Sequence, residues 1–219
     1  MKKTILFLTL LISISIFSQK NPEKDFGAWY MYNGSHQISD KFSLKSMAHF
    51  RFFEFGDDLR QFIARVGGSY KINNNLSATL GYAYLNTDNT FGDDGGDFNE
   101  HRIYEDFNIK HTISKLALAH RFRAEQRFLE SDTSHFVRYQ LNLSYPITNK
   151  LSIYLYDEVF FDSEGEAYNQ NWIGSGFKYK VSNKVKLQLG YQRISINKGL
   201  GLNRVQIGIA INTDHRKKK

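Results

Sequence analysis

The sequence predicts an all-β fold, a single antiparallel transmembrane β-barrel, from three patterns. A short turn recurs at a near-constant interval, the segments between turns alternate apolar and polar residues, and the connecting loops have two different lengths. The turn begins at Ile38, Ile72, Ile113, Ile147 and Val181, at intervals of 34, 41, 34 and 34 residues. An interval filled by turn, strand, loop and strand indicates an array of β-hairpins.

The residues between the turns exclude a helical solenoid, although some solenoids share a 34-residue period. Leu76, Ala78 and Leu80 alternate with Ser77 and Thr79. Because successive side chains of a strand point to opposite faces, this alternation gives a strand with one apolar and one polar face. The same alternation recurs over residues 137–145, 185–192 and 204–212.

The first element has the plan of a secretory signal peptide, which we place at residues 1–18. Two lysines precede an apolar run from Ile5 to Phe17, shorter than the roughly 20 residues of a spanning helix. The exported chain is expected to form the barrel over residues 19–213 in the cell outer membrane, followed by a basic tail, residues 214–219. The sequence has no cysteine, which excludes disulfide bonds.

The predicted strands are long enough to cross a membrane. The longest, Leu116 to Glu130, exceeds the roughly 9 to 11 residues that a crossing needs. We expect the tight turns at the periplasmic rim and longer outer loops opposite, as in transmembrane barrels. The longest loop, Thr87 to Asn99, absorbs the one irregular interval. Its acidic residues lack the spacing of a calcium-binding loop, so we expect a solvated external loop.

Aromatic residues make up 15% of the chain, and many lie near the ends of the predicted strands, among them Trp29, Phe53 and Phe160. Such residues favour the headgroup level of a bilayer, so we expect them to form girdles around the barrel. The mean hydropathy of −0.47 argues against a helical membrane protein. A barrel is compatible with this value because only alternate residues face lipid.

The strand count is left open between two values. One strand over residues 26–37 and five two-stranded repeats give eleven strands, whereas closed bacterial barrels normally have an even number and both termini in the periplasm. We therefore expect 10 to 12 strands. Either the first segment lies outside the barrel wall, or a twelfth strand lies near residues 19–25.

Charged residues identify the face that lines the lumen. Arg121, Arg123, Glu125 and Arg127 share one face of a strand, and an arginine facing lipid at the bilayer midplane costs about 2–4 kcal/mol. This face must therefore point inward. Extended by the same alternation, the predicted lumen-lining charge network is Arg51, Arg65, Arg121, Arg123, Glu125, Arg127, Arg138, Glu158 and Arg204.

Two interpretations of this network remain. In the first, arginine–carboxylate pairs fill a narrow interior and have a structural role, with Glu54, Glu105, Glu125 and Glu158 as the carboxylates. In the second, the arginines guide small anions through a narrow channel. Both apply if the network leaves a small pore.

Other function classes find little support in the sequence. The formal charge of +7 comes mostly from two leader lysines and four basic tail residues, so we expect no nucleic-acid partner. His111 near Ser114, and His135 beside Ser134, show no orienting third group. We expect no enzyme, metal or cofactor. The alternative is an outer-membrane lipid-modifying enzyme, a hydrolase or acyltransferase of phospholipid or lipid A.

Several segments resemble one family. FGAWYMY, HRFRAEQRF, FVRYQLNLSYPI, LYDEVFF and GLNRVQIGI are similar to the domain of unknown function 2490 family of outer-membrane β-barrel proteins from Gram-negative bacteria. The most specific piece is the run at Arg121, Arg123, Glu125 and Arg127. The resemblance implies the fold and location and names no activity or cofactor. The expected partners are outer-membrane lipid and lipopolysaccharide, the barrel-assembly machinery and, through an open lumen, a small anionic solute.

Overall fold

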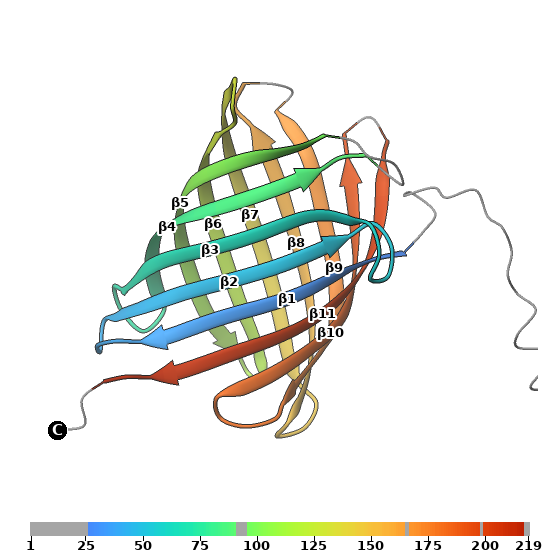
Figure 1. The fold of residues 1–219 in the computed structure, drawn as a ribbon. Helices are drawn as coiled ribbons and strands as arrows, with labels where there is room; N and C mark the ends of the chain where they lie inside the picture. The colour runs from blue at the N-terminus through green and yellow to red at the C-terminus, as the bar shows by residue number, and fades with distance from the viewer. Residues whose placement is uncertain (1–25, 91–95, 165–166, 198, 217–219) are drawn as a thin grey trace, which may run out of the picture.

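The fold is a closed β-barrel in a computed structural model (Figure 1). The structure describes residues 26–90, 96–164, 167–197 and 199–216. These residues form eleven strands and no helix. Nowhere in these ranges is there a helix long and apolar enough to span a bilayer. The expected signal peptide, residues 1–18, lies outside the described residues, as do residues 217–219 of the tail.

The strands follow one another around the wall in chain order. They are β1 Phe26–Gln37, β2 Phe42–Phe52, β3 Leu59–Lys71, β4 Leu76–Asp88, β5 Asp97–Ile113, β6 Leu116–Phe128, β7 Thr133–Pro146, β8 Leu151–Asp162, β9 Tyr168–Lys180, β10 Val185–Ile196 and β11 Gly201–Asp214. Their lengths run from 11 residues in β2 to 17 in β5. Each strand can therefore cross a bilayer at the tilt of a barrel strand.

The described residues form eleven strands, within the expected 10 to 12, and the alternative that leaves the first segment outside the barrel wall is wrong. β1 belongs to the wall, where it pairs antiparallel with β2 and parallel with β11, Phe26 opposite Asn203 and Gln37 opposite Asp214. With an odd number of alternating strands the first and last run the same way, so the barrel closes through one parallel pair. β1 consequently starts at the rim opposite to the one where β11 ends (Figure 1). Residues 19–25, the place of a twelfth strand in the other alternative, lie outside the described residues.

Three of the five repeated turns share one hydrogen-bond pattern. In the last turn Ser182 Oγ accepts hydrogen bonds from the backbone N–H groups of Lys184 and Val185, at 3.2 and 3.1 Å. Asn73 and Thr148 make the equivalent bonds in their turns. A Ser, Thr or Asn at this position therefore stabilises the turn locally. The five tight turns define one rim, called the turn rim below, and the other connections define the loop rim.

The strands extend further toward the loop rim than the sequence indicates. Asp88 of β4 pairs with Asp97 of β5. Both ends of the expected loop from Thr87 to Asn99 therefore belong to strands, and only the residues between Asp88 and Asp97 remain as a loop. At the near end of the remaining connection, Asp88 Oδ1 accepts a hydrogen bond from the backbone N–H of Thr90 at 2.8 Å. Residues 91–95, which include part of the acidic sequence, lie outside the described residues.

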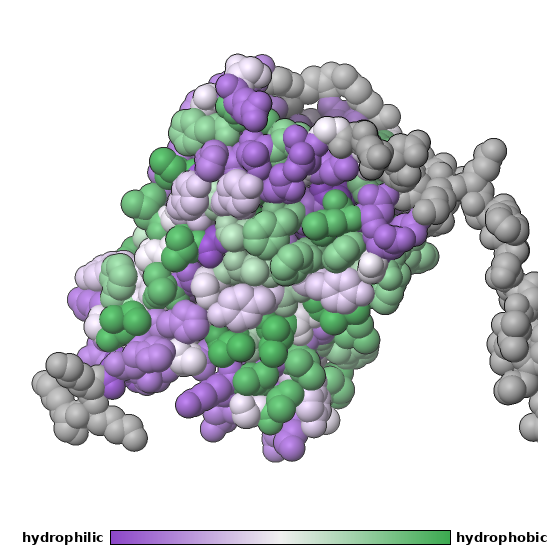
Figure 2. Space-filling view, in the orientation of Figure 1, coloured by the Kyte–Doolittle hydropathy of each residue, from purple (hydrophilic) through white to green (hydrophobic). Residues whose placement is uncertain are grey.

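The outer surface of the wall is apolar. Every strand contributes at least one large hydrophobic side chain to it, and the most exposed include Leu80 at 61% and Leu189 at 58%. Figure 2 shows hydrophobic side chains gathered across the middle of the wall and hydrophilic ones toward the loop rim. A soluble protein rarely exposes so continuous an apolar surface, whereas a membrane barrel presents it to lipid.

Three aromatic side chains expected at the headgroup level lie inside instead. Trp29, Phe53 and Phe160 are 3%, 5% and 1% exposed. Trp29 and Phe160 both pack against Trp172, with ring centroids 5.3 and 4.5 Å apart. A barrel of this strand number encloses a narrow interior that large side chains must fill. The girdle prediction is therefore wrong for these residues.

Tyrosines of β8 fill the interior where it faces β9 to β11. The Tyr156 ring lies across Gly174, where a Cβ atom would stand 2.5 Å from the ring. Its hydroxyl donates a hydrogen bond to Gln192 Oε1 at 2.5 Å and accepts one from Gln206 Nε2 at 2.9 Å. Glycine in β9 thus makes room for an uncharged network that occupies this side of the lumen.

The start of the expected basic tail is held at the turn rim. The backbone N–H of His215 donates to Gln37 O at 2.8 Å, and Arg216 Nη1 donates to Asp40 Oδ1 at 2.9 Å. Hydrogen bonds to Asp214 and Asp40 raise the pKa of the Arg216 guanidinium above its usual value. The tail residues that the structure describes therefore close against the first turn of the chain.

Gly174→Val should lower the free energy of unfolding by about 1–3 kcal/mol, because the Tyr156 ring must leave its place and lose its hydrogen bonds. Urea unfolding in detergent micelles measures the change. Ser175→Val is the matched control, because Ser175 is the next residue of β9 and is exposed on the outer face. An equal loss in both variants would contradict this packing.

Candidate functional site: the charged lumen

The charged side chains of the lumen converge on Glu125 of β6. Five arginines have a nitrogen within 3.9 Å of its carboxylate: Arg65, Arg102, Arg123, Arg127 and Arg138. The shortest contact, from Arg138 Nη1, is 2.7 Å. Glu125 is only 1% exposed. A buried carboxylate is stable only with such partners, and removing either side of a buried pair leaves an uncompensated charge.

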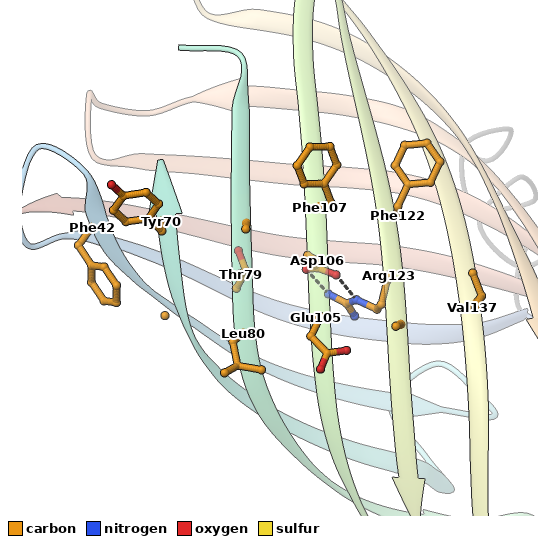
Figure 3. A pocket seen from close by; sticks show the side chains of 13 residues that line it. Phe42, Tyr70, Thr79, Leu80, Glu105, Asp106, Phe107, Phe122, Arg123 and Val137 are labelled. Atoms are coloured by element: carbon orange, nitrogen blue, oxygen red, sulfur yellow. Dashed lines mark hydrogen bonds and ion pairs between the residues drawn. The ribbon is translucent and has the colours of Figure 1, made fainter. Parts of the chain in front are cut away.

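Three further carboxylates extend the network. Glu158 accepts hydrogen bonds from Arg121 Nη2 at 2.7 Å and from Arg138 Nε at 2.9 Å. Asp106 binds Arg123 through two parallel bonds of 2.5 and 2.7 Å (Figure 3). Glu100 binds Arg102 in the same two-bonded way, at 2.6 and 2.7 Å. Two-bonded guanidinium–carboxylate pairs are strong and fix the plane of the arginine.

Aromatic rings support the arginines from the side. Arg127 Cζ lies 3.6 Å from the ring centroid of Phe136, and Arg138 Cζ lies 4.0 Å from that of Phe160. A guanidinium over an aromatic face gains a cation–π attraction. These contacts hold the cations in place where they are only partly matched by carboxylates.

The charges are distributed unevenly around the wall. Between the two rims, the interior carboxylates of the described residues are Glu100, Asp106, Glu125 and Glu158, and all belong to β5, β6 and β8. The opposite wall, β1 to β3, contributes cations to the lumen cavities but no carboxylate there. On that wall Arg51 Nη1 donates to the amide oxygen of Gln61 at 2.9 Å, and its Cζ lies 3.7 Å from the Trp29 ring centroid. One side of the lumen is therefore neutralised and the other is cationic.

Three cavities follow one another along the lumen. Their volumes are about 200 Å³ toward the loop rim, 240 Å³ in the middle and 350 Å³ toward the turn rim. Arg65 lines all three, Arg51 and Arg138 line the first two, and Arg121 lines the last two. Adjacent cavities thus meet at guanidinium groups, together with Trp29 and Trp172 between the first two cavities and Met47 between the last two.

The structure places every residue of the predicted network in this interior. Arg123, Glu125, Arg138, Glu158 and Arg204 are buried. The others, Arg51, Arg65, Arg121 and Arg127, line the cavities. Eight of the nine belong either to the ion-pair cluster around Glu125 and Glu158 or, in the case of Arg51, to the wall of β1 to β3. Arg204 is fully buried near the start of β11, and its Nη1 donates to the backbone O of Asn203 at 2.8 Å.

Two expected carboxylates lie elsewhere. Glu105 is exposed on the outer face of β5, where its carboxylate lies 3.5 Å from Gln126 Nε2. It stands in an apolar hollow on the outside of the wall that Leu80 and Phe107 also line (Figure 3). Expecting it inside was wrong, because its neighbour Asp106 faces the lumen and adjacent residues of a strand face opposite ways. Glu54 lies in the connection between β2 and β3.

Glu100 and Arg102 also belong to the network, although they are not among its predicted members. Both are buried and bonded to each other. The sequence contains a signal for this part of the network. Polar residues occupy every second position of the strand, as expected for its inward face: Glu100, Arg102, Tyr104 and Asp106. The prediction of a loop up to Asn99 conceals this alternation, because β5 begins at Asp97.

The histidine and serine pairs considered from the sequence do not form a catalytic arrangement. The His111 ring stacks on His120 at 5.3 Å, and His135 lies 3.7 Å from Glu164. A Ser–His contact occurs elsewhere: His36 Nε2 lies 3.1 Å from Ser46 Oγ on the outer face of β1 and β2. Sequence reasoning missed it because the two residues meet only across the hairpin.

Glu125→Gln should destabilise the barrel by about 3–5 kcal/mol, since it keeps the side-chain volume but leaves buried guanidinium groups without their shared anion. Urea unfolding in micelles gives the change in free energy. Glu105→Gln removes the same charge from the outer face and should leave stability unchanged or raise it. Equal losses in the two variants would mean that the lumen network does not stabilise the barrel.

Comparisons with known proteins agree with the architecture. The NanC porin, a solved structure, superposes with a TM-score of 0.56 at 10% sequence identity, covering 84% of this chain and 97% of that one. The KdgM porin gives a TM-score of 0.49 at 17% identity, covering 80% and 86%. No curated protein sequence matches the chain significantly. Residues 26–212 match the family described as protein of unknown function DUF2490, and the chain, with its barrel of outer-membrane type, therefore belongs to that family.

Proposed function

We propose that this protein is a porin-like barrel of the outer membrane that conducts small anions through a narrow, arginine-lined lumen, without catalysing a reaction. In this proposal residues 1–18 direct export, the turn rim faces the periplasm, and lipid and lipopolysaccharide cover the apolar wall. The barrel-assembly machinery inserts the chain. The observation that carries the proposal is the wall of β1 to β3, which lines the cavities with cations and no carboxylate.

The charge of the preferred solute follows from the excess of cations over carboxylates in the lumen. Six arginines of the network share four carboxylates, so the network itself is not neutral. Arg51 adds a cation that is matched only by the amide of Gln61. Charges in a narrow, low-dielectric passage focus their field on the solute path, which favours anions and repels cations.

The size of the solute follows from the cavities. The cavities have volumes of about 200 to 350 Å³. Guanidinium groups, several of them held in ion pairs, lie where adjacent cavities meet. A solute must pass these groups one at a time, so conduction is small and restricted to small ions or single small molecules. The purely structural interpretation differs on one point: a network that seals the lumen completely conducts nothing.

Arg51→Gln should shift the anion-to-cation permeability ratio toward one, because it removes the cation without a carboxylate partner and leaves the ion pairs of the network in place. The ratio is measured for purified protein in planar bilayers under a salt gradient. Arg216→Gln, a charge removal at the turn rim outside the strands, is the control and should leave the ratio unchanged. Absence of conductance in the bilayer, or a wild-type protein that prefers cations, would contradict the channel proposal.

A specific contact favours a second candidate, a lipid-modifying enzyme. Ser46 Oγ lies 3.1 Å from His36 Nε2 and 3.0 Å from Tyr32 Oη, and His36 Nδ1 lies 2.8 Å from Thr213 Oγ1. These groups meet over Gly34, where a Cβ atom would stand within 2.7 Å of Ser46 Oγ, Tyr32 Oη and His36 Nε2. A serine, a histidine base and a third group that orients the base form the plan of a nucleophilic site. The orienting group here is a neutral hydroxyl and not a carboxylate.

Turnover of phospholipid or lipid A decides between the candidates. If the second is right, purified protein in mixed micelles should release fatty acid or transfer an acyl chain. Ser46→Ala should then abolish this activity, while Ser43→Ala, on the inner face of the same strand, should retain it. No turnover by the wild-type protein removes the enzyme from consideration.

A further inference from the structure

We propose that the lumen holds a specific oxyanion-binding pocket formed by Trp29, Arg51 and Arg65, called the arginine pocket here. It rests on the proposed function in one respect, since solutes must reach the lumen from water. It goes further by assigning residues and a ligand chemistry. The ligand is a carboxylate, phosphate or similar oxyanion that accepts several hydrogen bonds.

Unsatisfied donors are the first observation. Trp29 Nε1, Arg51 Nε and Arg65 Nε are buried and have no hydrogen-bond partner among the described protein atoms. Trp29 is 3% exposed and the Arg65 side chain 11%. Buried donors are nearly always paired, and leaving one unpaired costs about 1–3 kcal/mol. Three such donors on adjacent strands indicate a partner that is not part of the chain.

The donors also share one space. Trp29 of β1 lies opposite Arg51 of β2, and Arg65 of β3 lies opposite Met47 of β2. All three donor side chains line the middle cavity of about 240 Å³ and extend into the cavity toward the loop rim. Both cavities are too small for a large solute, but each can hold a carboxylate or phosphate group.

The Arg51 guanidinium is fixed before any ligand arrives. Trp29 stacks against it at 3.7 Å, and Gln61 accepts a hydrogen bond from its Nη1 at 2.9 Å. Gln61 in turn donates to Thr87 Oγ1 at 2.6 Å, which fixes the amide. Its Nε has no hydrogen-bond partner among the described protein atoms. A guanidinium with a fixed plane loses little entropy on binding an oxyanion through two parallel hydrogen bonds.

The charges of the pocket point to an anion and not only to water. Arg65 reaches a carboxylate only at 3.9 Å, and that carboxylate, Glu125, is already bound at 2.7 Å by Arg138. Among the described residues Arg51 has no carboxylate oxygen within ion-pair distance. Water satisfies a donor but leaves a buried charge uncompensated, whereas an oxyanion satisfies both.

Tryptophan fluorescence tests the pocket directly, because the chain has two tryptophans and both line it. The Trp172 ring lies 5.3 Å from that of Trp29, and both rings border the same two cavities. The protein in detergent micelles is titrated with iodide and with caesium at constant ionic strength. Iodide should quench strongly and saturably and caesium weakly. Inorganic phosphate and acetate should each protect against iodide, and their relative strengths identify the preferred oxyanion.

The variant Arg51→Gln should weaken the protection by phosphate about tenfold or more, the effect of losing a charged hydrogen-bond donor. Arg65→Gln serves as a second variant, and the heat-dependent shift in gel migration shows that each barrel is folded. Lys186→Gln is the matched control, because it removes one cation from β10, outside the pocket. It should change the protection by about twofold at most, as expected of a distant screened charge.

Three results would overturn the arginine pocket: equal quenching by iodide and caesium, no protection by either oxyanion, or an equal loss in Arg51→Gln and Lys186→Gln. These outcomes are separate from failure of the channel. Anion-selective conduction without protection would leave the proposed function and remove the pocket. Saturable protection with a silent bilayer would leave the pocket and remove the channel.

Discussion

Glu125 accepts contacts from five arginines at the centre of the lumen, and much of the interior is arranged around this one anion. Its neighbours Arg123 and Arg138 are also bonded to Asp106 and Glu158, so the ion pairs of four strands, β5 to β8, form one unit. Charges buried in a narrow barrel are tolerated only when such bonds replace water. The aromatic rings of Phe136 and Phe160 then support guanidinium groups that the few carboxylates do not fully match.

The need to pair buried charges makes the wall of β1 to β3 unusual, because its cations have no carboxylate partner on that wall. Tyrosines and glutamines fill much of the side between β8 and β11, where Lys178 Nζ lies 4.6 Å from the Tyr154 ring centroid, and the carboxylates stay on β5, β6 and β8. On β2 and β3 the cations Arg51 and Arg65 remain with weak compensation. A barrel selected only for stability gains nothing from such a wall, because unmatched buried cations lower the stability of the fold. The proposed passage for anions would account for their presence.

Much of this arrangement could be predicted from the sequence, and the errors have physical causes. Alternation identified the strands and the inward face, since a period of two is a direct consequence of strand geometry. It could not identify the closure of the barrel, because parallel pairing of β1 with β11 depends on the whole wall. Trp29 was misassigned because an aromatic residue near a strand end suits both a girdle and a narrow interior. Ser46 and His36 meet only through hairpin register, which the turn sequence does not determine.

The central claim is that the lumen prefers anions because one of its walls lacks carboxylates. The reversal potential of single openings under a tenfold gradient of potassium chloride tests this most directly. An anion-selective lumen gives a potential of the sign set by chloride movement, close to the chloride equilibrium value. A potential near zero, or one of the sign set by potassium, would contradict it.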